Sequence, residues 1–530
     1  MSVFTAIAAP ASLRAPRTHY PLVGVGAVLI AAFVSTLNTR ITTFGLADIR
    51  GGLGLGFDEG SWLTSIFSAS QMLITPAAAW LSTVIGPRRF LFWATVVFAL
   101  ASLMVPLSSG YAEVVTLQAV RGLAVGTFIP SALGFILRAM APRWWIWGIA
   151  AYSFRFVFSQ NVASSLEALY SEMGRWQWIF WQNVALAPIL IVLIVIGMPD
   201  QPVDRNLLRR TDWGGVVFSG LGFALLYAGI DQGNRLDWLS SGVVVGLLLG
   251  GGLLIIAFFV NEALVEFPLI HLKIAAASYV WVPAMLITVY GFGTTATAFV
   301  LPDYLTRVQG LRALQIGDVL NWIALPQFVL VPATAIVLRW IDARLLIALG
   351  FAIIAVGSWM DSGLTHDWAN ADFLPSQIVE SVGLAVAITA LVTFAVANIT
   401  PPQAAAIAAT IQTARLFGAE LGSAFVQTFV RVREQFHSNL IEQHLASGSD
   451  IVERIVTAVS AGFSDHAGQG DPTAQALATI GARVQRESYV LAYIDAFWAI
   501  AWVLAAAILL LLLLRPPPPN PLTPPRIPSR

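Results

Sequence analysis

Long, nearly uncharged apolar stretches dominate this sequence and decide what it can fold into. A helix needs about 20 mostly apolar residues to cross the hydrocarbon core of a bilayer, and fourteen segments of the 530-residue chain meet that requirement. The predicted spans are 21–46, 61–85, 90–107, 112–138, 145–168, 176–197, 211–231, 240–260, 277–301, 315–338, 344–361, 375–398, 404–430 and 491–514. Charged residues make up only 11% of the chain, too few to cover a water-facing surface. We therefore predict an all-α integral membrane protein embedded in a lipid bilayer.

The composition also excludes several classes of function. The net charge is zero and no long basic run occurs, which argues against a nucleic-acid binder. The absence of Cys excludes disulfides, thiolate metal sites and a cysteine nucleophile. His437 and His444 would share a helix face, which we interpret as a solvated face and not as a metal site. No catalytic motif and no phosphate-binding GxxxxGK[ST] loop is present. We expect no enzyme activity, no cofactor and no metal, and an ion gradient as the source of work.

The distribution of basic residues predicts the orientation. An even number of spans places both termini on one side of the membrane. With cytoplasmic termini, the inside segments hold 15 basic residues and the short outside loops hold five, in agreement with the positive-inside rule. Residues 1–20 and the Pro-rich segment 515–530 then become cytoplasmic tails. Abundant Ala and a single Lys, Lys273, suggest a bacterial genome, so we expect the inner membrane of a bacterium.

An internal repeat divides the chain into two halves. QAVRGLAVG (118–126) resembles QIVESVGLAV (377–386). The distance from Pro142 to Arg155 is 13 residues, and the distance from Pro402 to Arg415 is also 13. These matches predict two six-helix halves and two additional helices between them. The predicted segments are 21–197, 211–260 and 277–514. Duplicated halves are typical of transporters that bind substrate between the repeats.

Several stretches carry a resemblance to a known family. They are LADIRGGLGLGFDEGSWLTSIFSASQM (46–72), RGLAVGTFIP (121–130), RWQWIFWQNVAL (175–186), LDWLSSG (236–242) and LPDYLTRVQGLRALQIG (301–317). On these stretches the chain resembles the major facilitator superfamily and, within it, the fourteen-span drug:proton antiporters of the EmrB/QacA type. The resemblance implies the major facilitator fold, export of small organic compounds driven by a proton gradient, and a periplasmic adaptor as partner.

The chain departs from this family at its usual coupling residues. Asn38 stands in LNTRITTFGLA, where the family has an acidic residue. The helix-4 motif places Arg where this chain has Gln118, and the Arg occurs at Arg121 instead. FSQNVASS (158–165) lacks the Gly-Pro pair of the antiporter motif. The family's proton-coupling residues therefore do not transfer one for one.

Ionisable residues inside the predicted spans are candidates for the substrate and proton pathway. Each costs at least about 2.5–3.5 kcal/mol at mid-span, so it usually faces a water-filled cavity or a partner. The candidates, with the polar residue of the first span, are Asn38, Arg40, Arg121, Arg155, Glu380, Arg415 and Glu420. Arg121 would attract an anionic group or a nearby carboxylate, and Glu380 would be that carboxylate or a contact for a cationic drug. The alternative is a structural ion pair, or a Glu near the outer interface.

Arg155 and Arg415 occupy equivalent places in the repeat. Glu420 follows Arg415 by five residues, or 140° around a helix, so the two do not form an i,i+4 pair and each needs a partner on another helix. Glu420 either carries a proton or is a structural acid, and it lies in a Gly418–Gly422 frame that favours close helix contact. We predict a second close-packing face at Gly242, Gly246 and Gly250.

The long loop 431–490 is predicted to be a periplasmic helical hairpin. Its apolar stripe would serve self-packing or an adaptor protein; the stripe is Phe436, Leu440, Ile441 and Leu445. Three functions remain open. The first is a proton-coupled exporter of amphiphilic compounds or drugs. The second is an exporter of anionic aromatic or lipid-like compounds, and the third is a non-transporting membrane scaffold or sensor.

Overall fold

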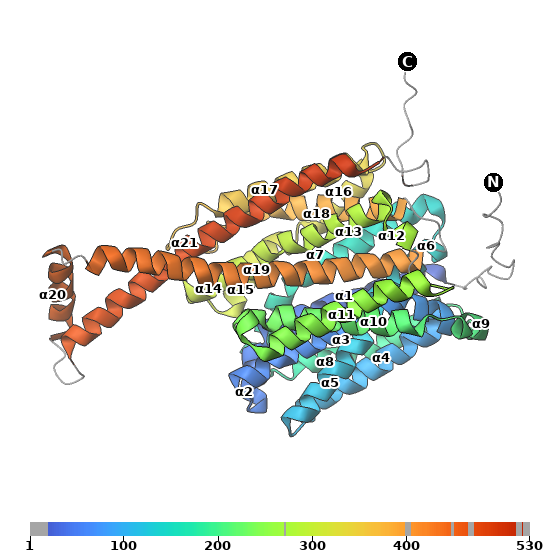
Figure 1. Cartoon of the computed structure of the whole chain (residues 1–530), viewed down its shortest axis with the longest axis horizontal. Helices are drawn as coiled ribbons and strands as arrows, with labels where there is room; N and C mark the ends of the chain where they lie inside the picture. The colour runs from blue at the N-terminus through green and yellow to red at the C-terminus, as the bar shows by residue number, and fades with distance from the viewer. Residues whose placement is uncertain are drawn as a thin grey trace, which may run out of the picture.

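A computed structural model describes residues 20–269, 272–397, 404–446, 450–464, 471–515 and 522. This part of the chain forms an elongated bundle of helices with a long helical arm at one end (Figure 1). Except for Tyr20, Arg515 and Leu522, the two predicted tails lie outside the described residues. The turn at Pro402 that defines the second repeat also lies outside them.

Helices of the N-terminal half and the insertion follow the predicted spans closely. The first half contains α1 (Pro21–Phe44), α2 (Leu46–Leu53), α3 (Phe57–Ile85), α4 (Pro87–Met104), α5 (Tyr111–Gly126), α6 (Phe128–Ala139), α7 (Trp145–Glu172) and α8 (Trp178–Gly197). The insertion contains α9 (Arg205–Arg209), α10 (Trp213–Gly233) and α11 (Gly242–Leu264). Short 3₁₀ turns lie at η1 (Val105–Leu107), η2 (Pro142–Trp144) and η3 (Trp238–Ser240).

The C-terminal half is more interrupted. It contains α12 (Leu272–Ala275), α13 (Ser278–Gly293), the π-helical η4 (Ala296–Val300), α14 (Leu301–Arg307), α15 (Ala313–Ala324), α16 (Gln327–Val337), α17 (Ala343–Asp361), α18 (Leu374–Ala397), α19 (Ala404–Ala446), α20 (Asp450–Ser464), α21 (Pro472–Leu510) and the 3₁₀ turn η6 (Leu511–Leu513). The break between α15 and α16 falls at Pro326, because proline removes a helical hydrogen bond. A π segment likewise interrupts the span that begins with α13.

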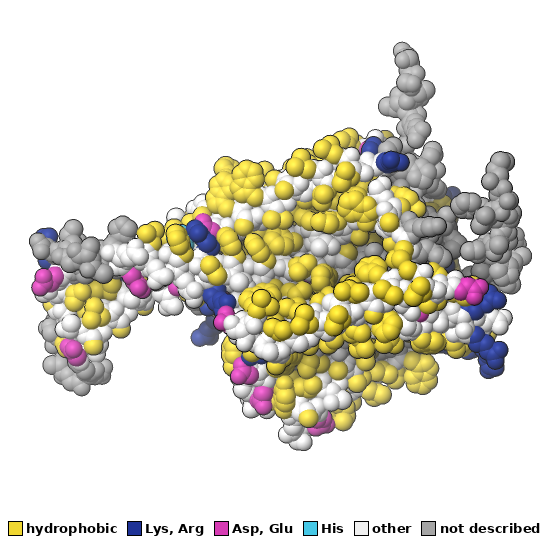
Figure 2. Space-filling view, viewed as in Figure 1, with side chains coloured by type: hydrophobic (Ala, Val, Ile, Leu, Met, Phe, Trp, Pro, Cys, Tyr) yellow, Lys and Arg dark blue, Asp and Glu magenta, His cyan; other side chains and the backbone are white. Residues whose placement is uncertain are grey.

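The helices account for the predicted number of spans. Within the described residues, 11 helical segments are long and apolar enough to cross a membrane. Three further helices, α3, α7 and α19, are also long enough to cross a membrane, with 29, 28 and 43 residues, but they carry more polar residues than the 11 segments. With these three, fourteen long helical segments lie at the places of the fourteen predicted spans, and 11 of them meet the length and composition of a membrane span. Figure 2 shows apolar side chains over the body of the bundle and charged side chains gathered towards its ends.

The two helices of the insertion have different surroundings. α10 packs against α3 of the first half and α19 of the second. α11 packs on the outside of α10 and leaves Leu249, Leu253 and Ile256 exposed, as expected for a lipid-facing helix. α10 therefore lies where the two halves meet, whereas α11 covers it from the lipid side.

Glycine packing corrects one prediction. A Cβ atom on Gly242 or Gly246 would meet nothing within 4 Å, and one on Gly250 would meet only Leu225 at 3.7 Å. The predicted close-packing face on this helix is therefore wrong, because these glycines face away from other helices. A Cβ on Gly418 would lie 2.2 Å from the Thr288 carbonyl oxygen of α13. The Gly418–Gly422 frame is the one that allows close helix contact.

The arm, residues 431–490, continues the membrane helices without a break. The 43-residue α19 is about 65 Å long at 1.5 Å per residue, and it runs out of the bundle. The chain then passes through α20 and returns along α21 (Figure 1). The predicted hairpin thus has a third short helix at its tip. At its base, Asp495 accepts a hydrogen bond from Arg433 at 2.6 Å and lies 2.8 Å from the His437 ring nitrogen, which ties α21 to α19.

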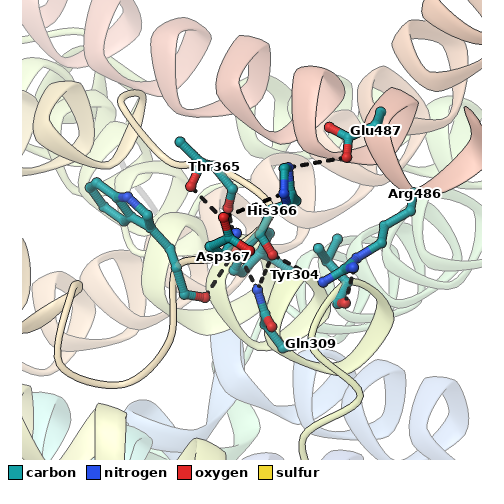
Figure 3. Close-up of polar contacts among 9 residues, drawn as sticks. Tyr304, Gln309, Thr365, His366, Asp367, Arg486 and Glu487 are labelled. Carbon is teal, nitrogen blue, oxygen red and sulfur yellow. Dashed lines mark hydrogen bonds and ion pairs between the residues drawn. The ribbon is translucent and has the colours of Figure 1, made fainter. Parts of the chain in front are cut away.

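Polar contacts also fix the arm to the body of the C-terminal half (Figure 3). Gln309, after α14, donates to the Tyr304 hydroxyl at 3.0 Å and to the His366 carbonyl oxygen at 2.7 Å. Arg486 of α21 donates to the same His366 carbonyl at 3.0 Å, and Glu487 lies 3.1 Å from the His366 ring. These contacts tie the base of the arm to the loop that joins α17 to α18.

Candidate substrate and proton pathway

Arg121 lies in a polar cluster inside the N-terminal half. Its guanidinium is fully buried and donates to Asn38 Oδ1 at 3.0 Å, to Ser102 Oγ at 2.9 Å and to the Gln118 side chain. Asn38 and Asn183 exchange two hydrogen bonds of 2.8 Å each. The cluster thus joins α1, α4, α5 and α8, which belong to a single half.

The arginine has aromatic neighbours and no acidic partner in the described part of the chain. Its guanidinium carbon lies 4.6 Å from the centre of the Phe180 ring, and the rings of Phe67 and Phe98 are also close. The structure does not bring Arg121 and Glu380 together. Arg121 is therefore held by amide and hydroxyl oxygens and by ring faces.

Glu380 lies between two helices of the C-terminal half. It accepts a hydrogen bond from Ser358 Oγ at 3.1 Å, and the Asp361 carboxyl lies nearby. Both acids are fully buried, and neither Asp361 carboxyl oxygen has a hydrogen-bond partner in the described part of the chain. Asp361 is the last residue of α17, and no sequence pattern distinguishes it from an ordinary acid at a helix end. This pair joins α17 to α18 inside one half, near the arm end of the bundle.

Glu420 belongs to a cluster that crosses the boundary between the halves. It lies within hydrogen-bonding reach of the Tyr227 hydroxyl and the Asp231 carboxyl, both on α10. Asp231 also accepts hydrogen bonds from Ser65 of α3 and, at 3.0 Å, from Gln232. The cluster therefore connects α19 of the C-terminal half to the insertion and to the N-terminal half. Sequence reasoning missed Tyr227 and Asp231, because it treated the insertion as peripheral.

Arg40 forms a contact between the two halves on the arm side of this cluster. Its Nη2 donates to the Ala298 carbonyl oxygen at 2.6 Å, which joins α1 to the π-helical η4. Its charge is also close enough to Tyr227 to interact with it. Ser165 of α7 donates to Asn321 Oδ1 of α15 at 3.2 Å and adds a second contact between the halves.

Arg155 and Arg415 face each other from the two halves. Arg155, on α7, donates to Thr36 Oγ1 at 2.8 Å and lies 4.3 Å from the centre of the Tyr152 ring. Arg415, on α19, donates to Gln412 Oε1 at 3.2 Å. The two charges are close enough to repel each other. The repeat predicted their equivalence, and in the structure they come from α7 and α19 and lie near each other.

The halves also touch at the end opposite the arm. The guanidinium carbon of Arg339, after α16, lies 5.6 Å from the centre of the Trp147 ring near the start of α7. Together with the arm-side contacts of Arg40 and Ser165, this encloses the Arg155–Arg415 layer between the halves. An alternating-access transporter must break one set of such contacts while it keeps the other.

The chain is similar in sequence to several known bacterial export and resistance proteins. It is 22% identical over 484 residues to the multidrug export protein EmrB of Escherichia coli (strain K12), covering 90% of this chain and 91% of that protein. It is 22% identical over 477 residues to the fatty acid resistance protein FarB of Neisseria gonorrhoeae, covering 89% and 91%. The chain is thus distantly related to drug and fatty acid resistance proteins.

A solved structure supports the fold. The human organic anion transporter MFSD10 superimposes with a TM-score of 0.58 at 11% sequence identity, covering 93% of this chain and 99% of that one. The family profile described as the Major Facilitator Superfamily matches residues 28–423. The all-helical fold predicted from the sequence is confirmed, and the chain belongs to the major facilitator superfamily of membrane transporters.

Proposed function

We propose that this protein is a proton-coupled antiporter that exports amphiphilic organic compounds across a bacterial inner membrane, with both termini in the cytoplasm. The observation that carries the proposal is the proximity of the Asp231 carboxyl on α10 and the buried Glu420 carboxyl on α19, across the boundary between the insertion and the C-terminal half. The relationship to EmrB and FarB supports the substrate class.

The contact between the two carboxyl groups provides a place for a proton. Two ionised carboxylates in this proximity would repel each other, which favours a proton on one of them. Asp231 lies on α10 and Glu420 on α19. A movement of α19 relative to α10 would separate the carboxyls and expose one to water. The proton would then be released on one side of the membrane and taken up again from the other.

Glu380 provides the matched comparison. Its partner Asp361 lies in the same half, and α17 and α18 pack closely along their length. A rocking motion of whole halves leaves that pair together. We therefore assign proton exchange to Glu420 and Asp231, and a structural role to Glu380.

The proposal is tested in liposomes with an imposed pH gradient. A cationic dye and an aromatic carboxylate are both screened, and for whichever the wild type exports, Glu420→Gln and Asp231→Asn should abolish uphill export and the proton flux that accompanies it. Glu380→Gln should keep both fluxes. Uphill export that survives in both Glu420→Gln and Asp231→Asn would refute the assignment. Absence of any flux in folded wild-type protein would favour a non-transporting scaffold or sensor.

The arm provides a surface for a periplasmic adaptor protein. Val432, Phe436 and Leu440 are exposed on α19, and Leu477 is exposed on α21. Leu445 of the predicted stripe has a side chain outside the described residues. Replacing Phe436 and Leu440 with Ser should abolish resistance in cells and leave transport in liposomes intact. Loss of both activities would instead indicate that the stripe packs within this protein.

A further inference from the structure

We propose that Arg155 and Arg415 together bind the anionic head group of the transported compound, so that carboxylates and sulfonates with an apolar body are the preferred substrates. This inference rests on the proposed export function and names the chemistry of its substrate site. It depends on the position of the two arginines, on their lack of counter-charge and on their aromatic surroundings.

The position of the pair suits a substrate site. Arg155 lies ten residues from the start of α7, or about 15 Å along a helix that must cross a hydrocarbon core about 30 Å thick. Arg415 lies at the equivalent place in the other half, and the two side chains are 3% and 8% exposed. A ligand held by both arginines would contact both halves at mid-membrane, where substrates of repeat transporters bind.

The pair carries a positive charge that nothing in the described chain compensates. Neither arginine has a carboxylate partner among the described residues, and each charge makes the burial of the other less favourable. Arg155 Nε and Gln412 Nε2 are buried donors without a hydrogen-bond partner in the described part of the chain. A carboxylate or sulfonate would offset one of the two positive charges and accept hydrogen bonds from these donors.

The surroundings provide an apolar surface beside the charges. Arg415 lies 4.3 Å from the centre of the Phe156 ring, and that ring lies 5.9 Å from the Tyr290 ring of α13. Tyr152 covers Arg155 on the other side. An aromatic or aliphatic body attached to the anion could pack against these rings. A small inorganic anion has no apolar body and would not pack against these rings.

Arg121 differs from this pair because side chains of its own half satisfy its guanidinium. It has three side-chain hydrogen-bond partners and three aromatic rings, all within the N-terminal half. It would therefore stay satisfied in any arrangement of the halves. Arg155 lies on α7 and Arg415 on α19, in different halves, so an anion bound between them would be sensitive to how the halves are arranged.

The test measures equilibrium binding to the purified full-length protein, without any gradient. Three ligands share one aromatic body and differ in charge: 2-naphthalenesulfonate, 2-naphthalenemethanol and 2-naphthylmethylammonium. The sulfonate should bind at least about 10-fold more tightly than the alcohol, since charged hydrogen bonds are involved. Arg155→Gln and Arg415→Gln should each remove most of the preference for the sulfonate over the alcohol. Arg155→Lys should retain part of it, and Arg433→Gln, in the arm, should retain all of it.

Three outcomes would overturn the inference. The first is equal binding of the three ligands to the wild-type protein, a result that does not depend on any variant folding. The second is a sulfonate preference that persists in both Gln variants. The third is complete competition by chloride when titrations in chloride and gluconate salts are compared, which would assign the pair to a small inorganic anion. Because binding is measured at equilibrium, failure of proton coupling through Glu420 would not affect the result.

Discussion

Restoring an acid at position 38 tests how the buried arginine of the N-terminal half is held. Asn38→Asp places a carboxylate where an amide oxygen now accepts from Arg121 at 3.0 Å. Asn38→Ala removes that acceptor. Both substitutions are at position 38. Asn38→Asp adds a negative charge beside the Arg121 guanidinium, whereas Asn38→Ala leaves the guanidinium with one hydrogen bond fewer.

The magnitudes follow from the contacts. Asn38→Ala deletes one hydrogen bond to a charged group and two that Asn183 shares, leaving buried donors unpaired; we expect a loss of about 3–5 kcal/mol in unfolding free energy. In Asn38→Asp, attraction across 3.0 Å is about 5–6 kcal/mol at an effective dielectric constant of about 20. Desolvation of the carboxylate costs several kcal/mol, and one Asn183 hydrogen bond is lost. Asn38→Asp should therefore remain within about 2 kcal/mol of the wild type.

The assay is unfolding by SDS in mixed micelles, followed by tryptophan fluorescence, in the wild-type and Arg121→Met backgrounds. With Arg121 present, Asn38→Asp should be far less destabilising than Asn38→Ala. With Arg121 removed, the order should reverse, because the new carboxylate is then buried without a partner. Equal effects of the two substitutions in both backgrounds would show that Arg121 does not interact with position 38.

Other predictions concern the movement of the halves, the packing of α19 and the base of the arm. Because the chain has no cysteine, Ser165→Cys combined with Asn321→Cys should form a disulfide that stops transport in liposomes until a reductant is added; transport by the fully cross-linked protein would contradict closure at this contact. Gly418→Ala should lower the unfolding free energy by about 1–3 kcal/mol in the SDS assay, whereas Gly246→Ala should be neutral or slightly stabilising. Asp495→Asn should widen the distance distribution between spin labels on the two arm helices, and an unchanged distribution would show that other contacts hold the arm.

The sequence predicted the bundle well because a membrane imposes a local rule. Each span must supply its own run of apolar residues, so the positions of most helices of the bundle are visible in hydropathy, and only α3, α7 and α19 carry more polar residues than the other long helices. The repeat added one long-range relation, the equivalence of Arg155 and Arg415, through a spacing of 13 residues. The arm was predicted as helical on the same local grounds, since its apolar residues recur at helical intervals.

Contacts between distant helices could not be obtained in this way. Glu420 was a candidate from its position, but its partners Tyr227 and Asp231 lie on α10, and no local pattern indicates which helix the insertion covers. The predicted close-packing face on α11 was wrong for the same reason. Small residues at every fourth position permit close packing but do not indicate that another helix lies against them. Gly418 has the same spacing and does meet a neighbouring backbone.

α19 connects the two proposed binding events physically. Arg415 and Glu420 are five residues apart, so they lie about 7.5 Å apart along the helix and point about 140° away from each other. One therefore faces α7 and the other faces α10. A rotation or tilt of this single helix that brings Arg415 towards Arg155 must also move Glu420 relative to Asp231. An anion that draws the arginines together would in this way alter the contact that holds the proton, which is the linkage that an exchanger of anionic compounds and protons requires.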